Sequence, residues 1–282
     1  MQPNIGPDWA ESAYLDALTD DGQTGFVMRL ARYPGHAVSW FWLHLFLPEG
    51  VVGYNDNALP LIGPPEATPL DAADVTHEMA GDNAGFVRRV GVRTSPEHAS
   101  IDVAVRAHRA AHAPDGAGAA PLRVRAELTP SHRADVSRPG RVEVFGPVTA
   151  EVTLEGRTFA LNAAGFWHEQ VGNRPNFAEA FTHSILRGET ISIVGTSLAR
   201  GGIGFALTGG ETSPLSRIDI SPPGVERTLD FELASGERVQ GVARRTHSYS
   251  TPAEEGRRPA SVVVAETDHG RLWGHINDWR PA

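Results

Sequence analysis

The 282-residue sequence contains no cysteine and no lysine. Without cysteine there can be no disulfide, no thiolate nucleophile, no iron–sulfur cluster and no Cys-ligated zinc. Without lysine there is no Schiff-base amine and no phosphate-loop lysine, which excludes pyridoxal-type enzymes and ordinary nucleotide hydrolases. The lack of cysteine also fits a reducing compartment, so we expect a cytoplasmic protein.

Long apolar runs are missing as well. No window reaches the roughly 18 apolar residues that a membrane helix needs, so no stable membrane insertion is expected. Residues 1–22 are acidic and lack the basic and apolar segments that are typical of a secretory signal. Acidic residues outnumber arginines by 34 to 25, which makes a broad nucleic-acid footprint unexpected. The oligomeric state stays open, and a homo-oligomer is compatible with the sequence.

Alternation of apolar and polar residues with a period of two dominates the chain. The first half shows it at residues 26–32, 38–47, 86–93, 100–108 and 122–128, and the second half at 141–146, 150–161, 190–199, 202–209, 227–233 and 238–245. Turn signals rich in Gly and Pro separate these segments. The pattern predicts an all-β protein built from antiparallel sheets, in sandwiches or barrels, with few short helices.

Helical periodicity is confined to residues 9–18 and a short segment at 176–181. The small-residue segment 112–120 is interpreted as a linker or a long hairpin loop. A domain boundary is expected near residues 162–165, where a hairpin over 151–161 gives way to a polar stretch. The prediction is two domains, 1–163 with a helical or irregular lead-in over 1–21, and 164–282.

The polar stretch FWHEQVGNRPNF, residues 166–177, is the leading candidate site. In an extended chain His168 and Glu169 face opposite sides, and a turn after them lets Asn173 and Arg174 point back. A histidine beside a carboxylate and a guanidinium suits proton transfer, because burial or a neighbouring charge can bring either acid toward a neutral pKa. The same groups can equally satisfy one another by hydrogen bonds at a domain junction. The sequence leaves both interpretations open.

Two tryptophan-rich segments offer further pocket residues. Trp40 and Trp42 share one face of an expected strand, and the segment 270–279 contains His275 and Asp278. Tryptophan walls bind apolar ligands and stabilise positive charge. An aromatic ladder in a strand more often belongs to a core, however, and the two polar residues can simply close a terminal strand.

Patterns for metal or cofactor binding are not apparent, although the chain has twelve histidines. HExxH and HxH are absent, and so is the GxSxG elbow of serine hydrolases. The GGIG and TGG segments are not followed by a helical pattern, so they are interpreted as strand turns and not as phosphate-binding loops. We therefore expect neither a metal nor a cofactor.

The segment RVEVFGPVTAEVTLEGRTFALNAAGFWHEQVGNR, residues 141–174, resembles the hydroxyneurosporene synthase-like proteins, a carotenoid hydratase superfamily with tandem lipocalin-like domains. There a strand pair leads into a motif such as Asp-His-Ser-Trp-Gly-x-Arg. His168 and Glu169 take the first two positions with the types exchanged, and Gly172 and Arg174 take the Gly and Arg positions. Val171 stands where the family has Trp.

The resemblance extends to residues 38–61, 196–210 and 272–279. It implies two barrel-like β-domains with a ligand cavity between or inside them. The superfamily includes hydratases, lipocalin-like pericyclic cyclases and proteins of unknown activity, so the resemblance implies the fold more directly than the reaction.

The leading hypothesis is a cofactor-independent enzyme that acts on a terpenoid or polyketide type of hydrophobic small molecule, by acid–base hydration, dehydration, isomerisation or cyclisation. His168 or Glu169 would donate the proton, and His275 or Asp278 would act as the opposing base. The substrate would be held by Trp167 together with the other aromatic and polar candidates, which are Trp40, Trp42, Asn173 and Arg174. The rivals are a lipocalin-like carrier or sensor of an apolar ligand and a carbohydrate-binding or glycosidase module.

Overall fold

The computed structural model describes residues 9–63, 75–95, 97–109, 119–136, 140–173, 179–199, 201–253 and 256–280. The chain divides into two compact units. The first comprises residues 1–17, 25–133 and 137–175, and the second comprises 18–24, 134–136 and 176–282. The boundary expected between residues 163 and 164 falls inside one continuous strand, β11 (Arg157–Asn173).

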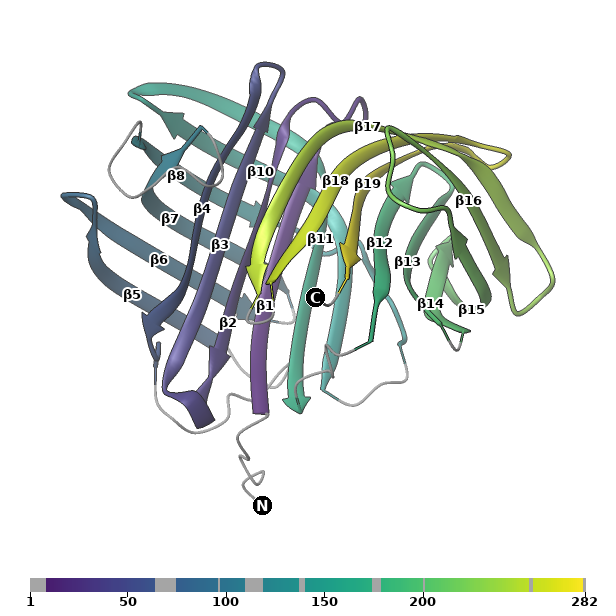
Figure 1. Cartoon of the computed structure of the whole chain (residues 1–282), viewed down its shortest axis with the longest axis horizontal. Helices are drawn as coiled ribbons and strands as arrows, with labels where there is room; N and C mark the ends of the chain where they lie inside the picture. The colour runs from purple at the N-terminus through teal and green to yellow at the C-terminus, as the bar shows by residue number, and fades with distance from the viewer. Residues whose placement is uncertain are drawn as a thin grey trace. The chain divides into compact units, whose positions relative to one another are not determined.

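The first unit is a single antiparallel sheet that returns on itself (Figure 1). Its other strands are β1 (Trp9–Leu18), β2 (Gly25–Tyr33), β3 (Val38–Leu47), β4 (Gly50–Pro60), β5 (Val75–Asn83), β6 (Phe86–Ser95), β7 (His98–His108), β8 (Ala119–Leu128), β9 (His132–Arg133) and β10 (Arg141–Leu154). They pair in the order β4-β3-β2-β1-β11-β10-β8-β7-β6-β5, with β9 on β10. One further residue pair, Gly53 with His108, joins β4 to β7 and closes the ring.

The second unit is a closed barrel in which the first and last strands also pair. Its strands are β12 (Phe181–Gly188), β13 (Ile191–Leu198), β14 (Gly201–Thr208), β15 (Glu211–Ile220), β16 (Glu226–Leu233), β17 (Arg238–Ala253), β18 (Gly256–Thr267) and β19 (Gly270–Trp279). Each strand pairs with its neighbours in sequence, and β12 pairs with β19. The all-β antiparallel class predicted from the alternation is confirmed.

Each unit has its own hydrophobic core. In the first unit, strands β2 to β4 cross β5 to β8 steeply (Figure 1), and both sets send apolar side chains into one cluster that includes Phe41, Leu43 and Val103. In the second unit the interior is filled by a separate cluster that includes Phe231 and Ile276. The alternation in sequence therefore sorts side chains between an interior and an outer face in both units.

The helix predicted for residues 9–18 is wrong, because this segment is strand β1. Ala, Leu and Glu favour helices, but that intrinsic preference is weak. Ala13, Leu15 and Ala17 lie two residues apart and are all buried in the core of the first unit, between β2 and β11. The packing of this alternate set outweighs the local preference.

Strands β10 and β11 form the hairpin that carries the candidate site. Their turn is Glu155–Gly156, with φ of 52° and 79°, which is the pair of left-handed residues that a tight hairpin turn requires. The turn fixes the register, which pairs Val142 with Glu169 and Glu143 with His168. The hairpin is longer than the 151–161 expected from the sequence, because its strands extend over Arg141–Leu154 and Arg157–Asn173.

Helices are nearly absent from the described residues. They contain one short 3-10 element, Pro34–His36, and no helix long and apolar enough to cross a membrane. Residues 112–118 of the expected loop lie outside the described residues, but the flanking strands β7 and β8 pair as a hairpin. Of the short helix expected at 176–181, residues 176–178 lie outside the described residues and Phe181 begins β12.

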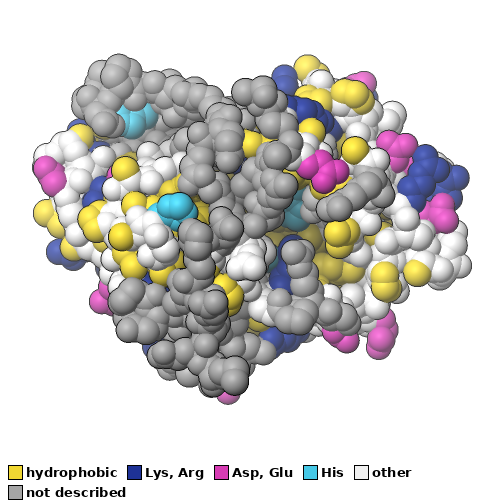
Figure 2. Space-filling view, turned by 60° about the horizontal axis from the view of Figure 1, so that its bottom comes forward, with side chains coloured by type: hydrophobic (Ala, Val, Ile, Leu, Met, Phe, Trp, Pro, Cys, Tyr) yellow, Lys and Arg dark blue, Asp and Glu magenta, His cyan; other side chains and the backbone are white. Residues whose placement is uncertain are grey.

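Charges of both signs are mixed over the described surface. On the face shown in Figure 2, arginine and acidic side chains are interspersed with hydrophobic and uncharged ones. Several form exposed ion pairs, such as Arg123 with Asp102 and Arg244 with Glu226. Exposed pairs of this kind contribute little to stability. The two units differ more in the polar groups that they bury.

Candidate functional site

Strand β11 sends its two predicted proton-transfer residues to opposite faces of the first unit. Trp167 and Glu169 point toward the interior, where the Nε1–H of Trp167 donates a 2.8 Å hydrogen bond to Oε1 of Glu169. Phe166 and His168 lie on the outer face, with their rings stacked at a centroid distance of 6.3 Å. The alternation expected from the sequence therefore separates the imidazole from the Glu169 carboxyl group.

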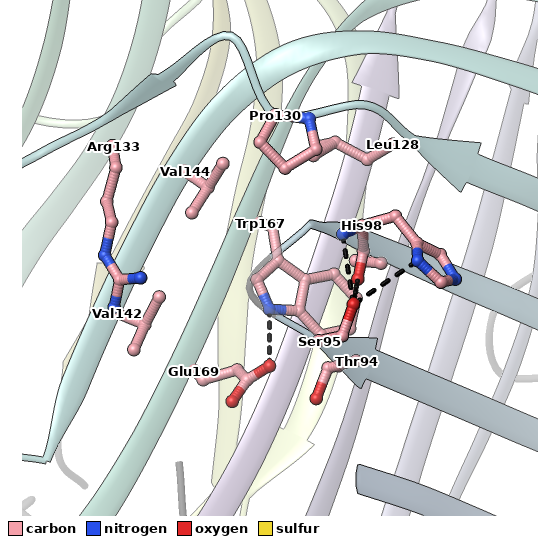
Figure 3. Close-up of a pocket in the computed structure, with 11 residues that line it drawn as sticks. Thr94, Ser95, His98, Leu128, Pro130, Arg133, Val142, Val144, Trp167 and Glu169 are labelled. Atoms are coloured by element: carbon pink, nitrogen blue, oxygen red, sulfur yellow. Dashed lines mark hydrogen bonds between the residues drawn. The ribbon is translucent and has the colours of Figure 1, made fainter. Parts of the chain in front are cut away.

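The interior contains a depression that we call the Trp167 hollow (Figure 3). Its apolar walls are Ala99, Leu128, Pro130, Val142, Val144 and the indole of Trp167, and its polar lining is Thr94, Ser95, His98, Arg133 and Glu169. The empty space bounded by these residues is ≈ 390 Å³, a volume that includes open solvent at the mouth of the hollow. Such a mixture of apolar walls and a few polar groups is typical of a site for a small organic molecule.

A neighbouring depression, the Arg32 hollow, shares Thr94 and Glu169 with the first. Its other lining residues are Glu11, Ser12, Ala13, Leu30, Arg32, Val75, His77 and Val171, and its space, again counted out to solvent, is ≈ 360 Å³. Each hollow as it stands holds only about one or two water molecules, so an organic ligand would require the lining side chains to move apart. Glu169 lies where the two hollows meet.

The Arg32 hollow is polar because it contains a buried ion pair. Glu11 and Arg32 bond through Oε2 and Nη1, and Nε of Arg32 donates a 2.6 Å hydrogen bond to the carbonyl oxygen of Ile62. Burial and the nearby Arg32 charge lower the pKa of His77 to about 4. The imidazole of His77 is therefore neutral at pH 7, and it does not add to the charge of the hollow.

On the outer face, His168 belongs to a second buried polar cluster. Its Nδ1 lies 3.3 Å from Oε1 of Glu143, which also accepts a bond from Nε of Arg141. Burial and the Arg141 charge lower the pKa of His168, against the opposing effect of Glu143. Burial by itself would raise the pKa of Glu143, but the contacts with His168 and Arg141 outweigh it and lower that pKa. A neutral imidazole beside a carboxylate accepts a proton more readily than it donates one.

The predicted aromatic wall of Trp40 and Trp42 is also on the outer face. The two rings form a cluster with Tyr33, at centroid distances of 4.6 Å and 6.2 Å from Trp40. Nε1 of Trp42 donates a 2.7 Å hydrogen bond to Asn57. Neither tryptophan lines either of the two hollows. The sheet therefore separates them from Glu169.

The predicted residues His275 and Asp278 belong to the second unit, on opposite faces of β19. Asp278 points into the barrel, where Arg227 donates two hydrogen bonds to it, of 2.8 Å and 3.2 Å, and Thr182 donates one of 2.8 Å. His275 points outward, and its Nδ1 lies 3.0 Å from the hydroxyl of Tyr249. The carboxylate of Asp278 is engaged on both oxygens, which suits a structural ion pair.

Of the predicted site residues, the structure thus brings together Trp167 and Glu169. It separates this pair from His168, Trp40 and Trp42 by the sheet of the first unit. Asn173 lies at the exposed end of β11, and Arg174 lies outside the described residues. The assignment of catalytic and binding roles stays a prediction.

Sequence reasoning missed Glu11, Arg32, His77 and Thr94. A signal for two of them was available. Arg32 continues the apolar alternation of Phe26, Met28 and Leu30, and Glu11 continues that of the buried side of β1. A charged residue in phase with the buried side of a strand indicates an interior polar site.

A metal-binding arrangement is not found among the described residues, in which no group of three or more His, Asp or Glu side chains is placed to hold an ion.

The fold defined by the ring and the barrel is that of a protein with two lipocalin-like domains, and solved structures share it. CghA aligns with a TM-score of 0.64 at 13% identity, over 98% of this chain and 89% of that one. A putative AttH from Nitrosomonas europaea aligns with a TM-score of 0.55 at 10% identity, over 100% and 98%. Kievitone hydratase from Nectria haematococca aligns with a TM-score of 0.52 at 9% identity, over 99% and 90%. The tandem lipocalin-like fold implied by the sequence resemblance is confirmed.

The chain belongs to a family defined by a domain of unknown function, DUF7064, whose model matches residues 2–223. No curated protein matches the chain in sequence.

Proposed function

We propose that the protein is an enzyme that binds a hydrophobic small molecule inside its first unit and transfers a proton through Glu169. The observation that carries the proposal is the position of this carboxyl group. It is 6% exposed, it lies where two interior hollows meet, and it is held by the indole of Trp167. A buried carboxyl group in contact with a ligand site is typical of general acid–base catalysis.

The chemistry follows from the surroundings of Glu169. Glu169 is buried, and its carboxyl group accepts a hydrogen bond from the N–H group of Trp167, which holds it at the edge of both hollows. The apolar walls exclude water and hold the carbon skeleton of the ligand. These features support hydration, dehydration, isomerisation or cyclisation, with the chain's own side chains supplying the chemistry.

Proteins of the same fold support this class of ligand. One of them is a kievitone hydratase, and CghA has been crystallised with the small molecule Sch210972. At identities of 13% or less, these structures support the fold directly and leave the substrate to experiment.

A carrier or sensor of an apolar ligand is the second candidate. The full engagement of the charged side chains that face the interior favours it, because Glu11 is bonded to Arg32 and Glu169 to Trp167. A carrier would hold its ligand in the same hollows and release it unchanged.

The experiment is to incubate the purified protein in D₂O with a hydrophobic metabolite extract of its source organism and to analyse the extract by mass spectrometry. Glu169→Gln removes the ionisable carboxyl group and keeps the shape of the side chain. Glu127→Gln, an exposed residue on the outer face of β8, is the matched control. We expect the wild type and the control to convert a metabolite with incorporation of deuterium at carbon, and Glu169→Gln to be at least 100-fold slower.

Equal conversion by Glu169→Gln and wild type would contradict the role of Glu169. A ligand that is retained and recovered unchanged by all three proteins would favour the carrier. Loss of conversion in His168→Asn but not in Glu169→Gln would move the chemistry to the outer face of β11.

A further inference from the structure

A proton that leaves Glu169 has to be replaced before the next turnover. The side chain is only 6% exposed, so bulk water does not reach its carboxyl group freely. A general acid in such a position needs a path to solvent, made of groups that accept one proton and release another. The two hollows that meet at Glu169 are the places where such a path can run.

His77 connects the Arg32 hollow to the surface. It lies on β5, the last strand in the sheet order, in phase with the buried Val75. Its side chain lines the hollow together with Glu169 and is itself only half-buried, so it also reaches solvent. A neutral imidazole has one N–H donor and one acceptor nitrogen. It can therefore take up a proton from solvent on one nitrogen and release another from the second nitrogen.

The space beside His77 and Glu169 suits water. The Arg32 hollow holds about one or two water molecules, and a buried water needs roughly two to four polar partners. Such partners are available, because the lining also includes the hydroxyl-bearing side chains of Ser12 and Thr94. The hollow therefore suits a short water bridge between the imidazole and the carboxyl group, and this bridge requires no movement of the walls.

The charge of Arg32 determines how the imidazole can work. The guanidinium is buried and bonds to Glu11 and to the carbonyl oxygen of Ile62. Burial and this charge lower the pKa of His77 to about 4. A second positive charge beside Arg32 is disfavoured, so His77 does not store a proton at pH 7. It can still pass protons on, provided that it releases one as it accepts the next.

The Trp167 hollow offers a poorer path. Its lining histidine, His98, has its Nδ1 at 3.3 Å from the hydroxyl oxygen of Ser95. Figure 3 shows Glu169 at the Nε1 edge of the Trp167 indole and the imidazole of His98 beyond the opposite edge. The carbon atoms of the ring, which lie between the two groups, neither donate nor accept a proton.

We propose that His77 is a relay residue, which returns protons from solvent to Glu169 through the water of the Arg32 hollow. A solvent proton binds one imidazole nitrogen while the other nitrogen gives its proton to a water molecule, and that water gives a proton to the Glu169 carboxylate. One proton enters and one arrives, and exchange with water restores the first tautomer. The inference rests on the proposed function, because it takes Glu169 as the proton donor. His77 acts through Glu169 and does not contact the substrate.

The test combines a substitution with chemical rescue. His77→Gln removes the imidazole and keeps a polar side chain, and His36→Gln makes the same change at an exposed histidine as a control. Turnover of the metabolite in the D₂O experiment is followed with and without added imidazole. We expect His77→Gln to slow turnover roughly 10- to 100-fold, free imidazole to restore it in proportion to its concentration, and His36→Gln to match wild type. A purely structural histidine would not give this rescue.

A second measurement needs no substrate. The indole N–H of Trp167 is bonded to Glu169 at 2.8 Å, so its exchange with D₂O reports how fast protons reach that carboxyl group. The exchange is measured by NMR on the full chain with ¹⁵N-labelled tryptophan, and Trp167→Phe assigns the signal. We expect His77→Gln to slow this exchange roughly tenfold and added imidazole to restore it. Thermal melts establish that the variants are folded, and His77→Asn serves if His77→Gln is unstable.

The outcomes separate the two proposals. Turnover that depends on Glu169 but is equal in His77→Gln and wild type would overturn the relay and leave the proposed function in place. A loss that free imidazole does not restore would also overturn the relay, and a rescued loss in His98→Gln alone would move the path to the Trp167 hollow. If wild type converted nothing, the proposed function would fall, and slower exchange at Trp167 in His77→Gln would still support the path. Unchanged exchange in that case would overturn both.

Discussion

The two units share one architecture and differ in what their strands enclose. The ring of the first unit closes through the single pair Gly53 and His108, and its interior contains polar hollows around Glu169. In the barrel of the second unit, each strand pairs with its neighbours in sequence, and the last strand pairs with the first along all of β12, from Phe181 to Gly188. Its interior polar group Asp278 is bonded on both oxygens.

The contrast shows how one fold supports either a site or a scaffold. A buried ion pair whose donors and acceptors are all used within the protein stabilises the surrounding strands, provided that neither partner is lost. A buried carboxyl group beside accessible space can exchange a proton or contact a ligand. The difference lies in the space next to the charges, since both units bury an arginine with an acid.

The largest expected effect is on the ion pair of the second unit. Asp278→Ala leaves Arg227 buried without its main partner and should lower the free energy of unfolding by about 3–5 kcal/mol. Glu11→Ala makes the same change at Arg32, whose side chain is only 1% exposed but lines a hollow with room for a water molecule, and should cost only about 1–3 kcal/mol. Urea unfolding of both variants measures the difference. Equal losses would show that the space beside Arg32 does not reduce the cost of leaving a buried charge unpaired.

A second variant controls for cavity formation in the barrel. Asp278→Ala combined with Arg227→Met removes both charges and should recover most of the lost stability. Failure to recover would show that packing, and not the unpaired charge, dominates the loss.

An intermediate effect is expected from pH in the first unit. The pKa of His77 falls to about 4 in the folded state because of burial and Arg32, whereas an unfolded histidine titrates near 6.5. The unfolded chain therefore binds more protons between these values, and stability is lost as the pH falls from about 6.5 to 4. This histidine should account for about 2–3 kcal/mol of that loss.

His77→Gln isolates the contribution. Unfolding free energies of wild type and variant are measured at pH 7 and pH 4.5, and the gap between their pH dependences gives the share of His77. Parallel pH profiles for the two proteins would contradict the burial of a neutral imidazole in the hollow.

The smallest effect is expected at the surface. Arg244 and Glu226 form an ion pair of 2.9 Å on the second unit, with side chains that are 77% and 58% exposed. Arg244→Ala should change the free energy of unfolding by less than about 1 kcal/mol, because water and salt screen the pair. Set against Asp278→Ala in the same barrel, the measurement tests whether burial decides the cost of breaking an ion pair.

Much of the fold could be predicted from local pattern. Segments such as 122–128 and 227–233 alternate clearly, and they form most of β8 and most of β16. Alternation is a local consequence of burying one face of a strand, so a single sequence is enough to show it. The helix predicted for residues 9–18 is wrong because their composition favours a helix. Their alternation becomes recognisable only from the burial of every second side chain when β1 pairs with β2 and β11.

The candidate site could be predicted only in part. The sequence showed that His168 and Glu169 face opposite sides, and the structure adds what lies on each side. Glu11 and Arg32 meet across the interior although they are 21 residues apart, and no local pattern gives that contact. Trp167 lies beside the carboxyl group of Glu169 because both side chains are on the interior face of the sheet. Trp40 and Trp42 lie on the outer face, and the sequence did not show which of these tryptophans would share a face with Glu169.

The position of β11 in the first unit has a consequence for synthesis on the ribosome. The strand joins β1 on one side to β10 on the other, so residues 9–60 and 75–154 can form two partial sheets before residues 157–173 emerge. Until then each partial sheet has an unpaired edge that can associate with other chains. Completion of the first unit therefore waits for one late hairpin. We therefore expect the addition of β11, the strand that carries Glu169, to limit the rate at which the nascent chain covers its unpaired edges.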